Sequence, residues 1–249
     1  MSVIPLPCIA SIPFMHLFDS KLDLFVAAAD AFCDAANQAI RDRGVFRVSL
    51  SGGSTPRGLY ELLAERDLPW DQVQWFWGDE RNVSAEHEES NQRMVRQALL
   101  DHLPSEKVHA FAVPTGAGQG DAETTAVVAN QYETKLKTVF EGQSWPTWDL
   151  VLLGLGDDAH TASLFPETEA LTNSDRWFVA NWVPKFDAFR FTLTAPAINS
   201  GRRKLFLVSG ENKRDALERA HSKQPSDPNA YPSQLIEDAE FFVTTDAVA

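Results

Sequence analysis

The sequence predicts an α/β fold in which a mostly parallel β-sheet is covered by helices on both faces. Short apolar runs typical of buried strands alternate with amphipathic segments of helical periodicity along nearly the whole chain. Several of these runs end at a glycine that is followed by polar residues. Because the 249 residues show no change of composition and no internal repeat, we expect one domain over residues 1–249.

Composition and charge limit the classes of function. A net charge of -13 at pH 7, without a compensating basic stripe, argues against nucleic-acid binding, so a small anionic ligand would need local cations. Cys8 and Cys33 are too few for a disulfide framework, which favours reduced thiols and a cytoplasmic protein. Near the N-terminus Pro5, Pro7 and Pro13 interrupt the apolar residues, so we expect neither a signal peptide nor a membrane span.

The first predicted elements are a helix, a strand and a second helix. Ser20 can cap a helix over residues 21–43, and Gly44 can end it. A strand over residues 45–50 follows. A polar turn then leads into a helix that we expect Thr55 to cap, with Pro56 at its first position.

This turn is a candidate phosphate site. Two glycines let backbone N–H groups approach a ligand, hydroxyl groups can add hydrogen bonds, and a helix N-terminus favours an anion. An ordinary strand-to-helix turn is the alternative, because Gly, Ser and Thr are common in such turns. No Gly-Lys-Ser/Thr nucleotide loop is present, so a phosphomonoester fits better than a nucleotide. The candidate binding residues are Ser51, Gly52, Gly53, Ser54 and Thr55.

The strand predicted over residues 73–77 ends at Gly78 and is followed by Asp79, Glu80 and Arg81. Three charged residues after so apolar a strand indicate either a solvated turn or a site. We expect the next segments to be scaffold: a helix over residues 89–102, a strand over 109–113, a turn at Gly116, Gly118 and Gly120, and a helix over 122–140.

Residues 149–166 contain the candidate acid–base pair. An apolar run reads as a buried strand, Gly154 and Gly156 break it, and Asp158 and His160 follow, before a short segment that looks helical. An imidazole suits proton transfer because its ordinary pKa is about 6.5. A polar residue satisfied by its neighbours is the plain alternative, and we interpret His16, His87, His102 and His109 that way. We interpret His221 as a solvated residue at the end of a helix.

The second half of the chain predicts a hairpin and two more strands. Strands over residues 177–183 and 189–193 flank a turn, and Arg190 lies in the second of them. A strand over 204–208 leads through a polar segment containing Lys213 to a helix that ends near residue 220. After a turn at 226–229, a last strand covers residues 240–244.

The polar segments share one position relative to the predicted strands. Ligands of parallel α/β sheets bind at the carboxyl ends of the strands. Residues 51–55, 79–81, 158–160 and 210–213 each follow such an end. We therefore expect all four segments to lie along one rim of the sheet.

These segments resemble the glucosamine-6-phosphate isomerase/6-phosphogluconolactonase family, on its lactonase side. They stand in the family's order and span nearly the whole chain, so together they are more specific than any one motif. The matching segments are Ser51–Pro56, Trp77–Arg81 with Ser90–Asn91 downstream, Gly154–Pro166, Arg190–Thr194 and Gly210–Lys213.

The resemblance implies a three-layer α/β/α fold with a modified Rossmann-like sheet. It implies hydrolysis of 6-phospho-D-glucono-1,5-lactone to 6-phosphogluconate in the oxidative pentose phosphate pathway, without a metal or an organic cofactor. His160 matches the general base, and Asp158 would orient the loop or the imidazole. Arg81 and Lys213, with Arg190 near them, match the cationic substrate-binding positions, and we group Asp79 with them. The partner is a small phosphosugar lactone, and we expect a monomer or a small homo-oligomer.

One residue departs from the family pattern. Ala159 stands where the family usually has glycine before the histidine. If the backbone there has a positive φ, alanine would be strained.

Three other functions remain open from the sequence. A glucosamine-6-phosphate deaminase or isomerase would share the fold, but that branch typically continues Ile-Ala-Phe-Asn-Glu-Pro after its histidine, whereas this chain continues Thr161-Ala-Ser-Leu-Phe-Pro166. A non-catalytic phosphosugar-binding module would keep the phosphate turn without needing the acid–base pair. Gly154-x-Gly156-x-x-Ala159 is a weak dinucleotide-binding match, because no long helix clearly follows it.

Overall fold

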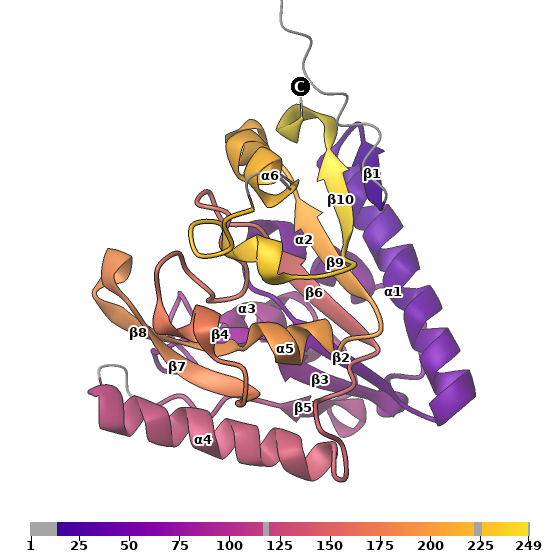
Figure 1. The fold of residues 1–249 in the computed structure, drawn as a ribbon. Helices are drawn as coiled ribbons and strands as arrows, with labels where there is room; N and C mark the ends of the chain where they lie inside the picture. Colours follow the sequence, from indigo (N-terminus) through magenta and orange to yellow (C-terminus); the bar gives the residue numbers. More distant parts are fainter. Residues whose placement is uncertain (1–13, 117–119, 222–225, 249) are drawn as a thin grey trace, which may run out of the picture.

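A seven-stranded parallel sheet forms the centre of the molecule, in the order β1-β10-β9-β6-β2-β3-β5 (Figure 1). This computed structural model describes residues 14–116, 120–221 and 226–248. Every pairing in the sheet is parallel, which confirms the predicted α/β class. Its strands are β1 Met15–Phe18, β2 Phe46–Leu50, β3 Val73–Trp77, β5 His109–Phe111, β6 Leu150–Gly154, β9 Lys204–Val208 and β10 Glu240–Thr244.

A second, antiparallel sheet of three strands lies against the first in the order β4-β8-β7. Its strands are β4 Asp79–Arg81, β7 Phe178–Val183 and β8 Ala188–Leu193. Gly78 joins the two sheets, because its N–H donates to Leu50 O at 2.9 Å and its carbonyl accepts from Leu193 N at 2.7 Å. The alternative of a solvated turn at residues 79–81 was therefore wrong, since these residues form a strand of the small sheet.

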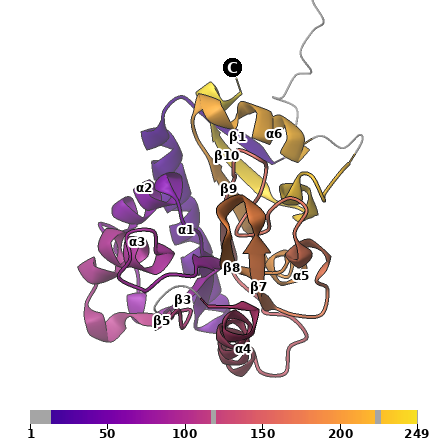
Figure 2. The same cartoon turned by 90° about the vertical axis from the view of Figure 1, so that its left-hand side faces the viewer.

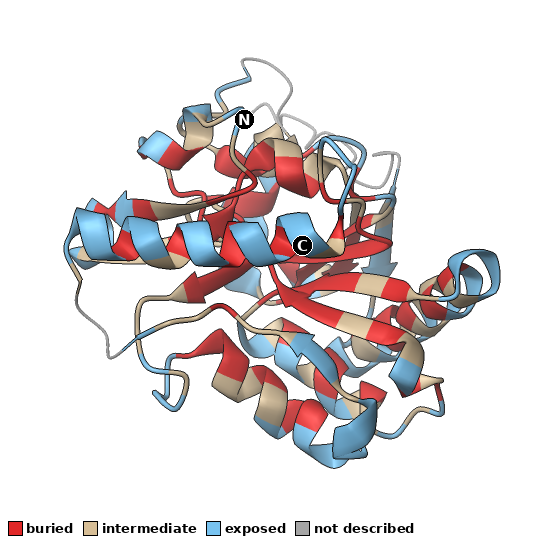
Figure 3. Ribbon diagram, turned by 90° about the horizontal axis from the view of Figure 1, so that it is seen from below, coloured by how far each residue is buried: buried red, intermediate tan, exposed pale blue. Residues whose placement is uncertain are grey.

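The helices and the small sheet make the outer layers. Helices α1, α2 and α3 lie together on one face of the parallel sheet, and the small sheet with α4 and α5 lies on the other (Figures 1 and 2). Burial follows this layering (Figure 3). The strands of the central sheet are mostly buried, whereas α4 has buried residues on one side and exposed residues on the other. No described helix is both long and apolar enough to cross a membrane. The helices are α1 Lys21–Arg43, α2 Ser54–Leu63, α3 Asn91–Ala98, α4 Ala122–Val139, α5 Ala195–Asn199 and α6 Arg214–His221.

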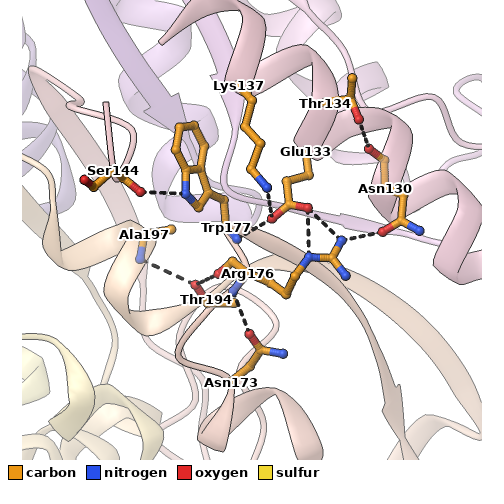
Figure 4. Close-up of polar contacts among 10 residues, drawn as sticks. All are labelled: Asn130, Glu133, Thr134, Lys137, Ser144, Asn173, Arg176, Trp177, Thr194 and Ala197. Carbon is orange, nitrogen blue, oxygen red and sulfur yellow. Dashed lines mark hydrogen bonds and ion pairs between the residues drawn. The ribbon is translucent and has the colours of Figure 1, made fainter. Parts of the chain in front are cut away.

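Helix α4 is fixed to the small sheet by the buried carboxylate of Glu133 (Figure 4). Its oxygens accept hydrogen bonds from Trp177 N at 2.7 Å and Arg176 Nε at 2.8 Å, and Lys137 Nζ lies 3.3 Å away. Burial alone would raise the pKa of this carboxyl group, but these donors outweigh it and lower the pKa below its usual value. The start of β7 is thereby held in place.

Several predicted boundaries differ from the structure. Helix α2 begins at Ser54, so Thr55 lies inside the helix and does not cap it. Helix α3 runs only from Asn91 to Ala98, because the chain leaves the α region at Leu99, where φ is -143°. Residues 161–166 form turns with one isolated bridge instead of a helical segment. Gly118 of the predicted glycine turn lies outside the described residues.

The sequence also gave no expectation of β1, which is an edge strand. It has four residues, none of them fully buried, and pairs only with β10. Such a strand lacks the apolar run by which the inner strands were found.

Candidate active site

One pocket of about 270 Å³ lies where the predicted rim was expected. Segments that follow β2, β3, β6 and β9 border it, and β8 of the small sheet adds a further side. This volume is close to the lower end of the range of small-molecule sites, which starts at about 300 Å³. The lining residues are Ser51, Gly52, Gly53, Asp79, Arg81, Gly154, Leu155, Gly156, His160, Ala162, Ser163, Phe165, Phe186, Arg190 and Lys213.

The turn after β2 presents backbone to the pocket. Gly53 has φ 103°, which lets α2 start at once without a side-chain cap. Gly52 must also be glycine, because a Cβ there would lie 1.9 Å from Oδ1 of Asn91. Tyr60, which is fully buried, fixes Ser51 through hydrogen bonds to its N–H at 3.1 Å and its carbonyl at 2.8 Å. The start of α2 is thus held open toward the pocket.

The two remaining residues of this turn do not line the pocket. Thr55 Oγ1 lies 2.9 Å from Ser209 Oγ, a hydrogen bond that joins α2 to the end of β9. Ser54 begins the helix. The structure therefore brings Ser51, Gly52 and Gly53 to the site and leaves Ser54 and Thr55 at its margin.

Three cationic side chains border the pocket. Arg81 and Arg190 are directly opposite each other on β4 and β8, and Arg190 lies over the ring of Phe186 at 5.1 Å. Burial, and then the charge of Arg81, lowers the pKa of Arg190. Like charges placed opposite each other on paired strands are destabilising, so an anion between them would relieve the repulsion. Lys213 reaches the pocket from the other side and pairs with Asp157.

Glu80 fixes the backbone next to these cations. Its fully buried carboxylate accepts hydrogen bonds at 2.8 Å from the backbone N–H groups of Arg81, Asn91 and Gln92. Burial raises the pKa of Glu80, and these donors counteract that effect. The neighbouring Asp79 lines the pocket and accepts from Ser163 Oγ at 2.9 Å.

His160 and Asp158 form a hydrogen-bonded pair beside the pocket. His160 Nδ1 lies 2.5 Å from Asp158 Oδ1, so the carboxylate selects the tautomer with its proton on Nδ1 and leaves a lone pair on Nε2. Burial would raise the pKa of Asp158, but hydrogen bonds from His160 and Lys185 outweigh it and hold the pKa well below its usual range. The ring stacks on Phe165 with centroids 3.9 Å apart.

The loop around this pair depends on two small residues. A Cβ at Gly156 would lie 1.9 Å from His160 Nδ1, so only glycine lets the imidazole pack there. Ala159 has φ 59°, in the left-handed region where alanine is strained and the family's usual glycine is not, and it is fully buried. Hydrogen bonds from Ala159 N to Gly156 O at 3.0 Å and from Ser233 N to Ala159 O at 2.9 Å hold this conformation.

Three residues that contact the acid–base pair or Arg190 were missed by the sequence reasoning. Lys185 Nζ lies 2.8 Å from Asp158 Oδ2, Phe165 stacks on His160, and Phe186 lines the pocket. Lys185 and Phe186 are in the turn between β7 and β8, where charge and an exposed aromatic ring indicate only a solvated turn. Phe165 lies inside the matching motif, but nothing in its spacing predicts a contact with the imidazole.

The described residues offer no cluster of three His, Cys, Asp or Glu side chains that could hold a metal ion. The chemistry available in the pocket is that of an imidazole–carboxylate pair facing three cations and a backbone-lined turn. Fold and pocket together define an α/β protein with a cation-lined pocket next to an imidazole–carboxylate pair.

The chain belongs to the glucosamine-6-phosphate isomerase/6-phosphogluconolactonase family, whose model matches residues 19–245. It is 44% identical over 227 residues to a 6-phosphogluconolactonase of Synechocystis, covering 90% of this chain and 91% of that protein. It is 37% identical over 225 residues to the Mycobacterium tuberculosis 6-phosphogluconolactonase, covering 88% and 89%. The solved 6-phosphogluconolactonase from Trypanosoma cruzi superposes with a TM-score of 0.82 at 29% identity, covering 95% of this chain and 96% of that chain.

Proposed function

We propose that this chain hydrolyses 6-phospho-D-glucono-1,5-lactone to 6-phospho-D-gluconate, the second step of the oxidative pentose phosphate pathway. The observation that carries the proposal is the arrangement of the pocket. Arg81 and Arg190 face each other at one side, and the His160–Asp158 pair borders the same pocket. The names of the relatives at 44% and 37% identity support the same reaction.

The phosphate group would bind among the cations and the turn after β2. Ser51, Gly52 and Gly53 offer backbone and hydroxyl donors, and Arg81, Arg190 and Lys213 supply positive charge in a chain whose net charge is -13. Asp79 adds a hydrogen-bond acceptor for a sugar hydroxyl group. Binding at this end would fix the lactone so that its C1 lies near His160.

Hydrolysis needs a base, a stabilised oxyanion and a proton for the leaving oxygen. His160 Nε2 would take a proton from water while the water oxygen bonds to C1. When the tetrahedral intermediate collapses, the bond from C1 to the ring oxygen breaks, and the same proton returns from Nε2 to that oxygen. Asp158 keeps the imidazole in the required tautomer and stabilises its transient positive charge.

A lactonase assay on the purified chain tests the reaction, with glucosamine 6-phosphate as the control substrate. We expect production of acid from the lactone and no release of ammonia from glucosamine 6-phosphate. Ammonia release would favour the deaminase or isomerase branch of the family. Binding of the sugar phosphate without turnover would indicate a non-catalytic module.

His160→Ala tests the general base. We expect kcat to fall by about 10²- to 10⁴-fold, the usual contribution of a positioned acid–base group, with KM within about twofold of the parent value. Arg57→Met, which removes an exposed ion pair with Glu61 on α2, is the control and should keep kcat unchanged. A His160→Ala variant with near-normal kcat would reject the assignment.

We also propose a cytoplasmic protein that acts as one domain and is a monomer or a small homo-oligomer. The free thiol of Cys33 supports the location, and a pocket built by both sheets supports the single domain. Light scattering on the purified chain measures the oligomeric state.

A further inference from the structure

The turn between β7 and β8 reaches the acid–base pair from outside. Residues Pro184–Phe186 form a single 3-10 turn, and Asp187 closes it with φ 48°. From this turn Lys185 Nζ lies 2.8 Å from Oδ2 of Asp158, while Oδ1 of the same carboxylate lies 2.5 Å from His160 Nδ1. Both oxygens of Asp158 are therefore engaged, one by the hairpin and one by the imidazole.

The same turn supports the imidazole through a second, apolar route. Phe186 packs edge-on against Phe165, with centroids 5.5 Å apart and planes at 83°. Phe165 in turn stacks on His160 at 3.9 Å and 28°. One short turn thus contacts both the carboxylate and the ring that hold His160.

The hairpin that carries this turn has a fixed base. Trp177, just before β7, donates its N–H to the buried Glu133 of α4 at 2.7 Å. Strand β8 pairs along its length with β7 and also with β4. Because the strands are anchored, the turn is a defined support and not a free loop.

We propose that Lys185 is a positioning residue that locks Asp158 in place and so holds His160 in the tautomer whose Nε2 can accept a proton. This inference rests on the proposed function, because it concerns the base of that reaction. Without the lysine, Asp158 could rotate away from Nδ1, and the imidazole would lose the acceptor that fixes its tautomer and its orientation. An imidazole with its proton on Nε2 has no lone pair on that nitrogen and cannot take a proton from water there.

Other charged groups also border the pocket beside His160 and are unchanged by substitution of Lys185. Asp79 and Arg81 border it from β4, and Arg190 borders it from β8. Lys213 borders it after β9, where Asp157 offsets its charge. A change in the tautomer of His160 on replacing Lys185 alone therefore reports the contact between Lys185 and Asp158.

The test compares Lys185→Met, which removes the charge but keeps the apolar stem, with Lys185→Arg, which keeps a cation. The lysine side chain is 56% exposed, so neither change disturbs the core. Arg66→Met is the matched control, because it removes a surface ion pair of the same 2.8 Å length, with Asp30. The measurements are kcat and KM with the lactone.

For Lys185→Met we expect kcat to fall about tenfold, since a displaced catalytic group loses alignment, with KM within about twofold of the parent value. Lys185→Arg should restore most of the lost kcat, and Arg66→Met should match the parent. A parent-like kcat in Lys185→Met would overturn the proposal. A raised KM at unchanged kcat would also overturn it, since Lys185 would then be a substrate contact.

Nuclear magnetic resonance of the ¹⁵N-labelled imidazole separates this inference from the proposed reaction. If the parent chain hydrolyses no lactone, the proposed reaction fails, but the ring signals still report the tautomer of His160. Lys185→Met should lower the fraction with the proton on Nδ1, and Lys185→Arg should restore it. An unchanged tautomer fraction in Lys185→Met would reject the positioning role on its own.

Discussion

At the scale of single residues, the loop before His160 places the imidazole at the pocket but requires a strained backbone at Ala159. Ala159 has a left-handed backbone, which costs an L-residue about 1–2 kcal/mol relative to its usual conformation. The loop keeps this conformation because hydrogen bonds hold both the N–H and the carbonyl of Ala159. The turn aims His160 at the pocket while Gly156 leaves room for its ring.

Replacing Ala159 with glycine should remove this strain. The lost methyl group is fully buried and worth about 0.8 kcal/mol, so we expect the free energy of unfolding of Ala159→Gly to stay within about 0.5 kcal/mol of the parent value or to rise. Ala36→Gly is the matched control, because Ala36 is equally buried but lies inside α1, where glycine should cost about 1–2 kcal/mol. Urea unfolding of both variants measures the difference. Equal losses in the two variants would show that the left-handed turn carries no strain.

Sequence reasoning found the residues that follow strand ends and missed those that arrive from elsewhere. His160 and Arg81 could be predicted because glycines mark where their strands stop and parallel strands end at one edge. Lys185 could not, since it is 27 residues from Asp158 and meets it only through the folding of the hairpin onto the pocket. Its neighbour Phe186 is exposed in the same turn, and a single aromatic residue in a turn does not by itself indicate a site.

At the scale of elements, sequence periodicity predicted most strands correctly, whereas only some of the predicted helix caps are present in the structure. Ser20 accepts from Asp23 N at 3.1 Å and Gly44 takes a left-handed conformation, as the pattern at the ends of α1 predicted. Thr55 is displaced from capping α2 because Gly53 already makes the turn, and its hydroxyl group bonds Ser209 instead. In the small sheet the predicted hairpin of β7 and β8 is confirmed. Its third strand, β4, was not predicted, because it has three residues and pairs with a strand more than a hundred residues away.

The contact between α4 and the small sheet gives an element-scale prediction. Glu133→Gln removes the charge that Arg176 and Lys137 face but leaves an acceptor for Trp177 N. We expect a loss of about 1–3 kcal/mol in the free energy of unfolding at pH 7, the usual cost of leaving a buried polar group poorly paired. Chemical denaturation of parent and variant measures it.

The same variant should show a defined dependence on pH. Because the folded-state pKa of Glu133 is lowered, its contribution is fully present above the unfolded-state pKa of about 4.3 and is lost as the pH falls through the folded-state value. The difference between parent and Glu133→Gln should therefore shrink as the pH is lowered from 7 toward 3. A difference that stays constant over this range would mean that the charge of Glu133 is not what holds α4.

At the scale of the whole molecule, an acidic chain concentrates positive charge at one pocket. The net charge of -13 repels anions at a distance, yet Arg81 and Arg190 lie side by side at the junction of the two sheets. Salt at physiological strength screens the distant charges over about 8 Å, whereas the partly buried cations of the pocket are screened much less. The local arrangement of these arginines, and not the net charge of the protein, therefore favours an anion in the pocket.

This arrangement predicts how bound anions change stability. Inorganic phosphate or 6-phosphogluconate should raise the melting temperature of the parent chain, and a ligand at 100 times its dissociation constant should add about 2.7 kcal/mol. In Arg190→Met the repulsion with Arg81 disappears, so the ligand-free protein should be at least as stable as the parent while most of the response to anions is lost. Calorimetric scans at increasing anion concentration measure both effects, with Arg66→Met as the control that keeps the parent response. If Arg190→Met responds to 6-phosphogluconate as strongly as the parent does, the paired arginines are not the anion site, because the stabilisation must then arise from contacts that this substitution leaves intact.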